Sequence, residues 1–430
     1  MSDFDTLGLA PELNQTLVRA GFTDPTPIQT QAIPLALAGH DVLGLAQTGT
    51  GKTLAFGLPL VHHLLEMPGK PDPKTVKALI LGPTRELVNQ IAESLRTLTA
   101  GTRLRVHTVV GGQSIGKQMN LLSRGTDILV ATPGRLIDLM DRRAVELGSA
   151  RYLVLDEADQ MLDMGFIHAL RKIAPRLGSP RQTMLFSATM PNQMEELSRA
   201  YLTDPRRVQV APPGKAADKI TQSVHFVEKP GKPAKLREIL ERDPDALTLV
   251  FGRTKHGAEK LMKGLVADGF NAASIHGNKS QGQRDRAIKA FRDGTVKVLV
   301  ATDVAARGID IPGVAYVINY ELPEVPDNYV HRIGRTARAG REGEAIAFCS
   351  AEEVDLLNQI ERLMKIEIPV AGGTKPAAVS TAKPKRRGGG GQRFRGPKPA
   401  NGPGNGPSGN PNSRKPSSHK RRRPRRPRAA

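Results

Sequence analysis

The sequence predicts an α/β fold with two tandem parallel-sheet domains and a disordered basic C-terminal tail. Short runs of Val, Ile and Leu recur along the chain, and each is followed by a polar loop and a helical pattern. Runs of this kind that lack alternation are typical of strands buried on both faces of a parallel sheet. The length of 430 residues also exceeds that of one compact domain.

The expected elements follow in order along the chain. The apolar runs of the first domain begin at Ala78, Asp127, Tyr152 and Thr183. Those of the second domain begin at Leu247, Ala272, Lys297, Ala315 and Glu344. The spacers between the runs are long enough for crossover helices, which makes βαβ units. An amphipathic helix that begins near Glu352 closes the second domain.

The segment APPGKAADK at 211–219 interrupts this pattern, and its two prolines and one glycine indicate a linker. We therefore place the first domain at 1–210, the linker at 211–218, the second domain at 219–370 and the tail at 371–430. The tail contains 17 Lys and Arg, no Asp or Glu, and no Leu, Ile or Met. It cannot bury enough apolar surface to offset the loss of chain entropy, so we expect it to be disordered.

Most of the net charge of +21 lies in this tail. Its Arg-Gly stretch around Phe394 and its dense basic run at 420–428 suit single-stranded nucleic acid, which such segments bind without sequence preference. We expect the tail to tether RNA. The alternative is a solubilising tail with no dedicated partner.

Several classes of protein are excluded. The single cysteine, Cys349, rules out intramolecular disulfide frameworks and cysteine-rich zinc sites, and its apolar surroundings predict a buried core thiol. The N-terminus lacks the basic and apolar regions of a secretory signal. The chain also lacks the run of about 18 apolar residues that a membrane-spanning helix requires. We therefore expect a cytoplasmic protein with no membrane partner.

A candidate phosphate-binding loop, AQTGTGKT, lies between an apolar strand pattern and an apolar helical run. Its glycines let backbone N–H groups curl around phosphates at a helix start. Lys52 would reach the β and γ phosphates of ATP, and the Thr53 hydroxyl would ligate Mg²⁺. The general pattern begins with glycine where this chain has Ala46. The expected nucleotide contacts in the loop are Ala46, Gln47, Thr48, Gly49, Thr50, Gly51, Lys52 and Thr53.

An acidic cluster, DEAD at Asp156–Asp159, directly follows the strand pattern YLVL. A carboxylate at a strand end can hold Mg²⁺ beside a phosphate loop, and this role suits Asp156. Glu157 is then placed to orient and deprotonate the attacking water. An acidic loop alone is more often a solvated turn, but the phosphate loop favours the catalytic interpretation.

In this order, the two motifs resemble those of the DEAD-box family of ATP-dependent RNA helicases. The resemblance spans residues 4–350 and implies two RecA-like domains. The segment GFTDPTPIQ looks like the family's adenine-recognition segment, in which Gln29 would pair with adenine and Phe22 would stack on it. Phe4 matches the family's upstream aromatic residue. HGNKSQ at 276–281 and GRTARAG at 334–340 look like the bacterial RhlE-like branch.

The resemblance also implies roles in RNA binding and coupling. Asp159, with Ser187 and Thr189 of the SAT motif, would link hydrolysis to strand separation. Asp310 would touch the ATP ribose. Arg335 and Arg338, in the second domain, would reach the γ-phosphate when the domains close, and an arginine supplied in this way can be worth roughly 10³–10⁵ in rate. Matches to the RNA-contacting motifs fall at Thr84, Arg85, Gly112, Thr132, Arg135, Arg253 and Thr302.

The resemblance therefore implies an RNA-stimulated ATPase that locally unwinds short duplexes or remodels RNA–protein complexes. Two alternatives remain. One is a DNA-directed helicase with the same two-domain ATPase arrangement, and the other is an ATP-gated RNA clamp or scaffold in which ATP turnover is incidental. The intact Glu157, Arg335 and Arg338 argue against a purely structural role. The expected partners are single-stranded RNA and short duplexes, and a ribosomal precursor or an RNA-decay complex is also compatible with the family. Ribosome biogenesis is a compatible biological role. A monomer is sufficient for this mechanism.

Overall fold

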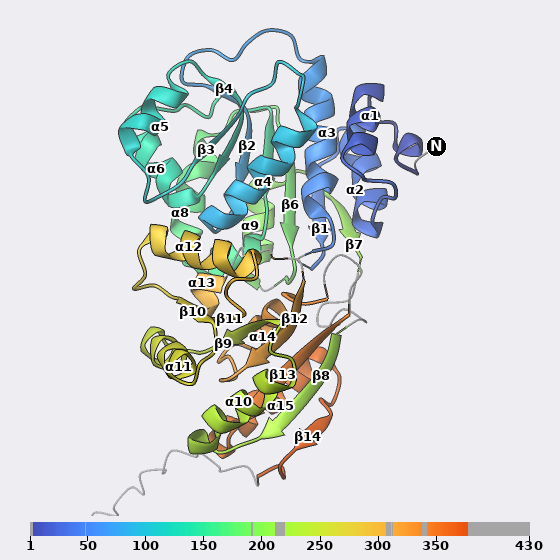
Figure 1. Cartoon of the computed structure of the whole chain (residues 1–430). Helices are drawn as coiled ribbons and strands as arrows, with labels where there is room; N and C mark the ends of the chain where they lie inside the picture. The colour runs from blue at the N-terminus through green and yellow to red at the C-terminus, as the bar shows by residue number, and fades with distance from the viewer. Residues whose placement is uncertain are drawn as a thin grey trace, which may run out of the picture. The chain divides into compact units, whose positions relative to one another are not determined.

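A computed structural model of the chain describes residues 3–47, 49–190, 192–210, 220–306, 311, 313–337 and 342–376. These residues form two sheets of seven strands each, and every strand pair is parallel (Figure 1). The expected α/β architecture of two tandem parallel-sheet domains is thereby confirmed. The expected linker at 211–218 and residues 377–430 of the expected tail lie outside the described residues.

The first sheet has the strand order β3-β4-β2-β5-β6-β1-β7. The strands are β1 (Val42–Leu45), β2 (Val76–Leu81), β3 (Val106–Val109), β4 (Thr126–Ala131), β5 (Tyr152–Leu155), β6 (Gln182–Ser187) and β7 (Arg206–Gln209). Every residue of β2, β4 and β6 is buried. Burial on both faces explains why these strands read as unbroken apolar runs in the sequence.

Helices cover both faces of the first sheet. On one face lie η1 (Asp3–Leu7), α1 (Pro11–Arg19), α2 (Pro27–Leu37), α3 (Lys52–Glu66) and α4 (Arg85–Leu98). On the other face lie α5 (Ile115–Leu122), α6 (Pro133–Asp141), α7 (Ala158–Asp163), α8 (Ile167–Ile173), η2 (Ala174–Arg176) and α9 (Asn192–Tyr201). Alternate side chains along each strand point to opposite faces of the sheet and pack in two separate cores.

The second sheet has the order β10-β11-β9-β12-β13-β8-β14, which is the order of the first sheet when its own strands are counted in sequence. The strands are β8 (Ile220–Phe226), β9 (Leu247–Phe251), β10 (Ala272–Ile275), β11 (Val298–Ala301), β12 (Val314–Asn319), β13 (Gly343–Cys349) and β14 (Val370–Gly372). The two domains are therefore copies of one topology. Because β14 pairs with β8, the second sheet includes Ala371 and Gly372, which the boundary at 370 assigned to the tail.

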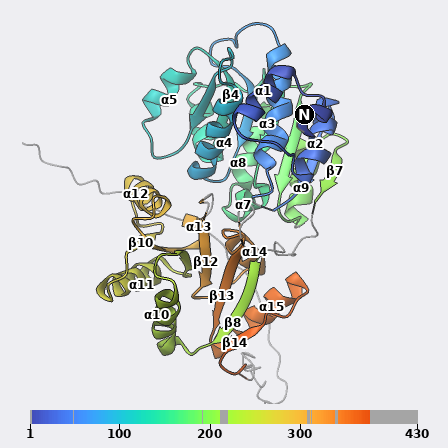
Figure 2. The same cartoon turned by 45° about the vertical axis from the view of Figure 1, so that its right-hand side comes forward.

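Helices also flank the second sheet on both faces (Figures 1 and 2). On one face lie α10 (Lys232–Arg242), preceded by η3 (Lys229–Gly231), and α11 (Lys255–Ala267). On the other face lie α12 (Gln281–Arg292), α13 (Asp303–Ala306), α14 (Pro326–Ile333), η4 (Ala351–Glu353) and α15 (Val354–Met364). The amphipathic helix expected near Glu352 is α15, and its apolar residues pack in the core as expected.

Cys349 is fully buried at the end of β13, and burial raises the pKa of its thiol to about 12. The expected core thiol is confirmed, and such a thiol stays protonated and inert at neutral pH. In the part of the chain that the structure describes, no helix has the length and apolar character needed to cross a membrane.

Parallel pairing brings the carboxyl ends of the strands to one edge of each sheet. In the first sheet, Leu45 at the end of β1 lies opposite Ser187 at the end of β6. Leu155, which precedes the DEAD cluster, lies opposite Leu185 on the same strand β6. The phosphate loop, the acidic cluster and the SAT motif therefore emerge side by side, at the edge where parallel sheets bind ligands.

Candidate functional site

The phosphate loop has the local structure that its glycines predict. Helix α3 begins at Lys52, and its N-cap residue Gly51 has a φ of 89° in the left-handed region. The Gln29 side-chain amide donates a hydrogen bond from Nε2 to the Gly51 carbonyl oxygen at 3.0 Å. A Cβ atom on residue 51 would lie 2.4 Å from this Nε2 atom. Both the backbone conformation and the close approach of Gln29 therefore require glycine here.

A pocket of about 640 Å³ opens above this loop. Its lining includes Phe22, Gln29, Gly49, Gly51, Lys52, Thr53, Asp156, Glu157 and, from the second domain, Arg335. Ala46 and Gln47 contribute through backbone carbonyls, which accept hydrogen bonds from Lys52 Nζ at 3.2 Å and from Thr50 Oγ1 at 2.8 Å. Most of the nucleotide contacts expected from the sequence thus lie in or beneath one pocket.

Of the expected nucleotide-site residues, Phe4 lies away from this pocket. Phe4 is fully buried in the core beside the first sheet, where it packs among apolar side chains rather than against the pocket. Thr48 and Asp310 lie outside the described residues, as does the second expected arginine, Arg338.

The electrostatics around the phosphate loop centre on the adjacent buried carboxylates of Asp156 and Glu157 and on the ammonium of Lys52. Lys52 Nζ lies 3.9 Å from Asp156 Oδ1. Burial raises the pKa of Asp156 to about 6, because desolvation of the carboxylate outweighs the attraction of Lys52. Glu157 takes the left-handed conformation at the start of α7, with a φ of 51°. This conformation is costly for glutamate, and such strain is common at active sites.

The pocket fits a divalent cation. The Lys52 ammonium lies 3.9 Å from the Asp156 carboxylate, and Glu157 Oε2 is buried without a hydrogen-bond partner among the described residues. Oxygen ligands of this kind suit Mg²⁺, and the Asp156 carboxylate and the Thr53 hydroxyl would hold it. Bound there beside ATP, the ion would neutralise charge on the phosphates.

Asp159 connects the acidic cluster to the SAT motif. Its Oδ2 atom accepts hydrogen bonds from Ala188 N, Thr189 N and Thr189 Oγ1 at 3.0, 3.0 and 3.1 Å. Ser187 Oγ donates to the Thr189 carbonyl oxygen at 2.7 Å, which fixes the turn. Burial opposes ionisation of Asp159, but His331, at 3.9 Å, together with Lys52 and the backbone donors lowers its pKa. Asp159 therefore binds Thr189 directly, and Ser187 joins them through the Thr189 carbonyl oxygen.

A second pocket, of about 430 Å³, gathers many of the expected RNA contacts, and we call it the groove. Its lining includes Thr84, Arg85, Gly111, Thr132 and Arg135. Arg135 is held in place because its Nη1 atom donates to the Gln113 carbonyl oxygen at 3.0 Å and to Gln118 Oε1 at 2.9 Å. Gly112 lies beside the groove with a φ of 76°, and a Cβ atom there would collide with the Arg85 guanidinium.

Sequence reasoning missed several residues of the groove, namely Asp138, Met164, Phe166, Arg284 and Val304. Phe166 follows α7 and offers a flat surface on which a base can stack. The signal available in the sequence was an aromatic residue after a glycine, between two helical patterns. Arg284 forms an ion pair with Glu86 at 3.1 Å, so this arginine is already committed to a carboxylate.

The structure does not bring Arg253 and Thr302 into the groove. Arg253 Nη2 contacts Glu353 Oε1 at 2.6 Å, and its backbone N–H donates to Glu321 Oε2 at 2.7 Å. Thr302 is buried at the end of β11. Both residues lie at carboxyl strand ends as expected, but the guanidinium of Arg253 is held by the buried carboxylate of Glu353.

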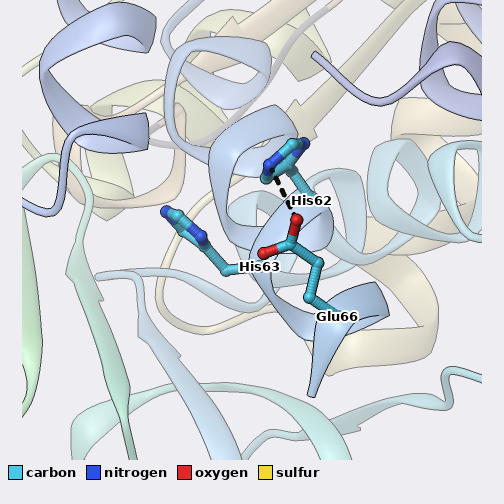
Figure 3. Close-up of side chains that lie close together, drawn as sticks. All are labelled: His62, His63 and Glu66. Atoms are coloured by element: carbon cyan, nitrogen blue, oxygen red, sulfur yellow. Dashed lines mark ion pairs between the residues drawn. The ribbon is translucent and has the colours of Figure 1, made fainter. Parts of the chain in front are cut away.

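Two histidines and a glutamate on α3 lie close enough together to suggest a metal site (Figure 3). Their ring contacts favour a different role. His62 Nδ1 accepts a hydrogen bond from Ala10 N at 3.1 Å, so Nε2 carries the proton and faces Glu66 at 3.6 Å. His63 Nε2 lies 3.3 Å from the Ala36 carbonyl oxygen, and its ring stacks on Tyr152. The histidines thus tie α3 to its neighbours.

Comparisons with known proteins agree with this geometry. A family model for DEAD/DEAH box helicases matches residues 26–197, and one for the helicase conserved C-terminal domain matches residues 231–340. The RNA helicase CshA of Limosilactobacillus reuteri is 43% identical over 370 residues, covering 85% of this chain and 72% of the relative. The DEAD-box RNA helicase CshA of Bacillus subtilis is 42% identical over 362 residues, covering 84% and 72%.

Solved structures give the same result. Dbp5 of S. cerevisiae bound to RNA and ADP BeF3 superposes with a TM-score of 0.77 at 31% identity, covering 86% of this chain and 96% of that chain. Mss116p bound to ssRNA and AMP-PNP gives a TM-score of 0.78 at 30% identity, covering 87% and 79%. The curated relatives are of the CshA type, so the RhlE-like branch expected from two short motifs is not supported. The chain belongs to the DEAD-box family of ATP-dependent RNA helicases.

Proposed function

We propose that the pocket above the phosphate loop hydrolyses ATP and that the groove binds the RNA that stimulates this reaction. The main support for this proposal is the position of α7 between the ATP pocket and the groove. Glu157 begins the helix in the ATP pocket, and Met164 and Phe166 follow its end in the groove. A shift of this short helix would alter both sites together, which is the requirement for coupling.

The roles of the ATP-site residues follow from their contacts. Gln29 holds the phosphate loop through Gly51 and retains one N–H and one lone pair for adenine. Lys52 neutralises phosphate charge, and Asp156 with Thr53 holds Mg²⁺. Glu157 accepts the proton of the attacking water through its unpaired oxygen. We assign to Arg335, with Arg338, the stabilisation of charge on the transferred phosphate.

The roles of the groove residues follow from their charge and position. Arg85 and Arg135 bind RNA phosphates, and Thr84 and Thr132, at the starts of α4 and α6, present helix N-termini to them. The relatives bound to RNA and nucleotide, Dbp5 and Mss116p, support this use of the groove. We propose that the protein locally unwinds short RNA duplexes in the cytoplasm as a monomer, with precursor ribosomal RNA or an RNA-decay complex as its setting.

The catalytic assignment is tested by Glu157→Gln in the full-length protein. The change removes the base but keeps the size of the side chain, so RNA-stimulated turnover should fall about 10²–10⁴-fold. Binding of ATP and RNA should persist, which filter binding with labelled RNA and a non-hydrolysable nucleotide would measure. Turnover at the parent rate in this variant would refute the assignment of the ATP site.

A further inference from the structure

A third concave surface lies on the first domain, outside the ATP pocket and the groove. It encloses about 610 Å³, and we call it the basic pocket. Four of its lining residues are exposed cations, Arg143, Arg171, Lys172 and Arg176, and its one acid is Asp141. Arg171 also pairs with Glu196 at 2.6 Å, but both side chains are more than half exposed, so the pair is weak.

The basic pocket and the groove lie at opposite ends of the same two helices. Gly134 and Arg135, in the first turn of α6, line the groove, whereas Met140 and Asp141, in its last turn, line the basic pocket. Helix α8, which packs on α6, repeats this arrangement (Figure 1). Phe166 precedes α8 in the groove, and Lys172 near its end lies in the basic pocket.

The distance between the two sites suits a continuous nucleic acid strand. Helix α6 has nine residues, which corresponds to a length of about 13 Å. Phosphates follow one another at about 3.4 Å of axial rise along one strand of a helical duplex. A strand that leaves the groove along α6 would therefore reach the basic pocket within about four phosphates.

Helix stability explains only part of the positive charge. Cations near helix C-termini interact favourably with the helix dipole, which accounts for Arg171 and Lys172. Arg143, however, follows α6 with a φ of 54°, in the left-handed conformation that favours glycine. Glycine would relieve this backbone strain, yet the position carries a cation that lines the basic pocket.

We propose that the basic pocket binds the phosphate backbone of RNA that extends beyond the groove. The first domain would then hold flanking nucleotides as well as the nucleotides bound in the groove. This inference rests on the proposed function, because the groove must be the RNA site. Exposed guanidinium and ammonium groups that do not contact base edges bind phosphates and do not discriminate between RNA sequences. The contact should therefore be independent of RNA sequence and sensitive to salt.

The test uses the full-length protein and two single-stranded RNAs, one just long enough to fill the groove and one extended at both ends. The triple variant Arg171→Gln, Lys172→Gln and Arg176→Gln should bind the extended RNA about tenfold more weakly and the short RNA unchanged. The slope of log affinity against log salt for the extended RNA should fall by about one for each lost phosphate contact.

A matched control removes three exposed cations from the second domain, through Lys260→Gln, Lys263→Gln and Arg292→Gln, none of which lines the three pockets described here. It should bind both RNAs like the parent protein. A second variant, Arg143→Gly, separates folding from binding, because it relieves the left-handed backbone while removing a cation. It should raise the unfolding temperature and still weaken binding of the extended RNA.

The outcomes separate this inference from the proposed function. If Arg135→Gln weakens binding of both RNAs and the triple variant leaves both unchanged, the groove is an RNA site and the basic pocket is not. Unchanged RNA binding with loss of an acidic protein partner would overturn the proposal in the same way. If Arg135→Gln changes neither RNA, the groove itself is misassigned.

Discussion

At the scale of single residues, the ATP site depends on carboxylates whose environments differ. Asp156 and Asp159 are both buried, yet burial raises the pKa of Asp156 whereas His331, Lys52 and backbone donors lower that of Asp159. Asp159 is thus fixed as an anion that holds the SAT motif. Lys52, at 3.9 Å, only partly compensates the burial of Asp156, so Asp156 suits the role of Mg²⁺ ligand that we propose better than Asp159 does. The sequence identified both residues but could not distinguish their charge states, because desolvation depends on the folded surroundings.

The pKa of Asp156 predicts a pH dependence of catalysis. Protonated Asp156 cannot hold Mg²⁺, so kcat/KM for MgATP should fall as the pH drops through about 6. The same pKa predicts the opposite pH dependence for the free energy of unfolding. Since the folded pKa lies above the unfolded value, the stabilisation by protonated Asp156 is full below the unfolded pKa and is lost as the pH rises through about 6. A pH profile of kcat/KM that stays flat from pH 7 to pH 5 would contradict this role.

A buried carboxylate in the second domain should dominate its stability. Glu353 Oε2 lies 2.5 Å from Lys232 Nζ, and Glu353 Oε1 lies 2.6 Å from Arg253 Nη2. Glu353→Gln should destabilise the protein by about 3–5 kcal/mol, because the buried Lys232 would lose its counter-charge. Urea unfolding measures this loss.

The neighbouring Glu352 provides the control for this variant. It also pairs with a lysine, Lys229, but both side chains are mostly exposed. Glu352→Gln should therefore leave the unfolding midpoint almost unchanged. Burial opposes ionisation of Glu353, but the attraction and hydrogen bond of Lys232, the Ser350 backbone N–H and Arg253 together lower its pKa. Its contribution to stability therefore exists above the unfolded pKa and disappears as the pH falls through the folded pKa. Equal effects of the two variants would show that the buried pair is not the cause.

At the scale of elements, the sequence predicts the strands with unbroken apolar runs well and the strands that contain polar residues or are very short poorly. The strands that begin near Ala78, Asp127, Tyr152 and Thr183 are buried runs, and all are present. The edge strands β3 and β7 expose polar or charged residues, and β14 has only three residues. Edge strands that contain polar residues, or that have only three residues, carry little apolar pattern, so β3, β7 and β14 could not be recognised from the sequence. Strand β8 pairs on both sides, with β13 and β14, but the polar residues Thr221, Gln222 and Ser223 interrupt its apolar pattern.

The start of α3 is the element on which nucleotide binding depends most. Gly51→Ala would place Cβ 2.4 Å from Gln29 Nε2 and impose a left-handed alanine. We expect ATP affinity to fall at least tenfold, with a loss of roughly 1–2 kcal/mol in stability. Gly116→Ala in α5 is the control, because nothing lies within 4 Å of its Cβ and helical alanine is favoured there. Equal ATP binding by the parent protein and Gly51→Ala, measured by titration with a fluorescent nucleotide, would contradict the proposed loop.

At the scale of the whole molecule, the two domains repeat one strand order but differ in their loops. Only the first carries the phosphate loop and the acidic cluster, whereas the second contributes Arg335 to the pocket lining. The sequence suggested two similar units, but strand patterns alone did not establish the shared order. That order depends on pairing between strands distant in the chain, such as β1 with β6, and such pairings leave no local pattern.

The basic tail predicts a property of the whole chain. A protein that ends at residue 376 retains β14 and the complete second sheet but loses most of the positive charge of the tail. We expect its RNA affinity to fall and its dependence on salt to become shallower, with the melting temperature unchanged. An equal salt slope for the shortened and full-length proteins would mean that the tail does not tether RNA.

The central claim is that RNA binding in the groove activates the ATP pocket. The most direct test is ATP hydrolysis by the full-length protein alone, with single-stranded RNA, and with single-stranded DNA of the same sequence. We predict strong stimulation by RNA, little by DNA, and loss of the stimulation in Arg135→Gln. Equal stimulation by DNA, or no stimulation by either nucleic acid, would contradict the coupling of the two sites.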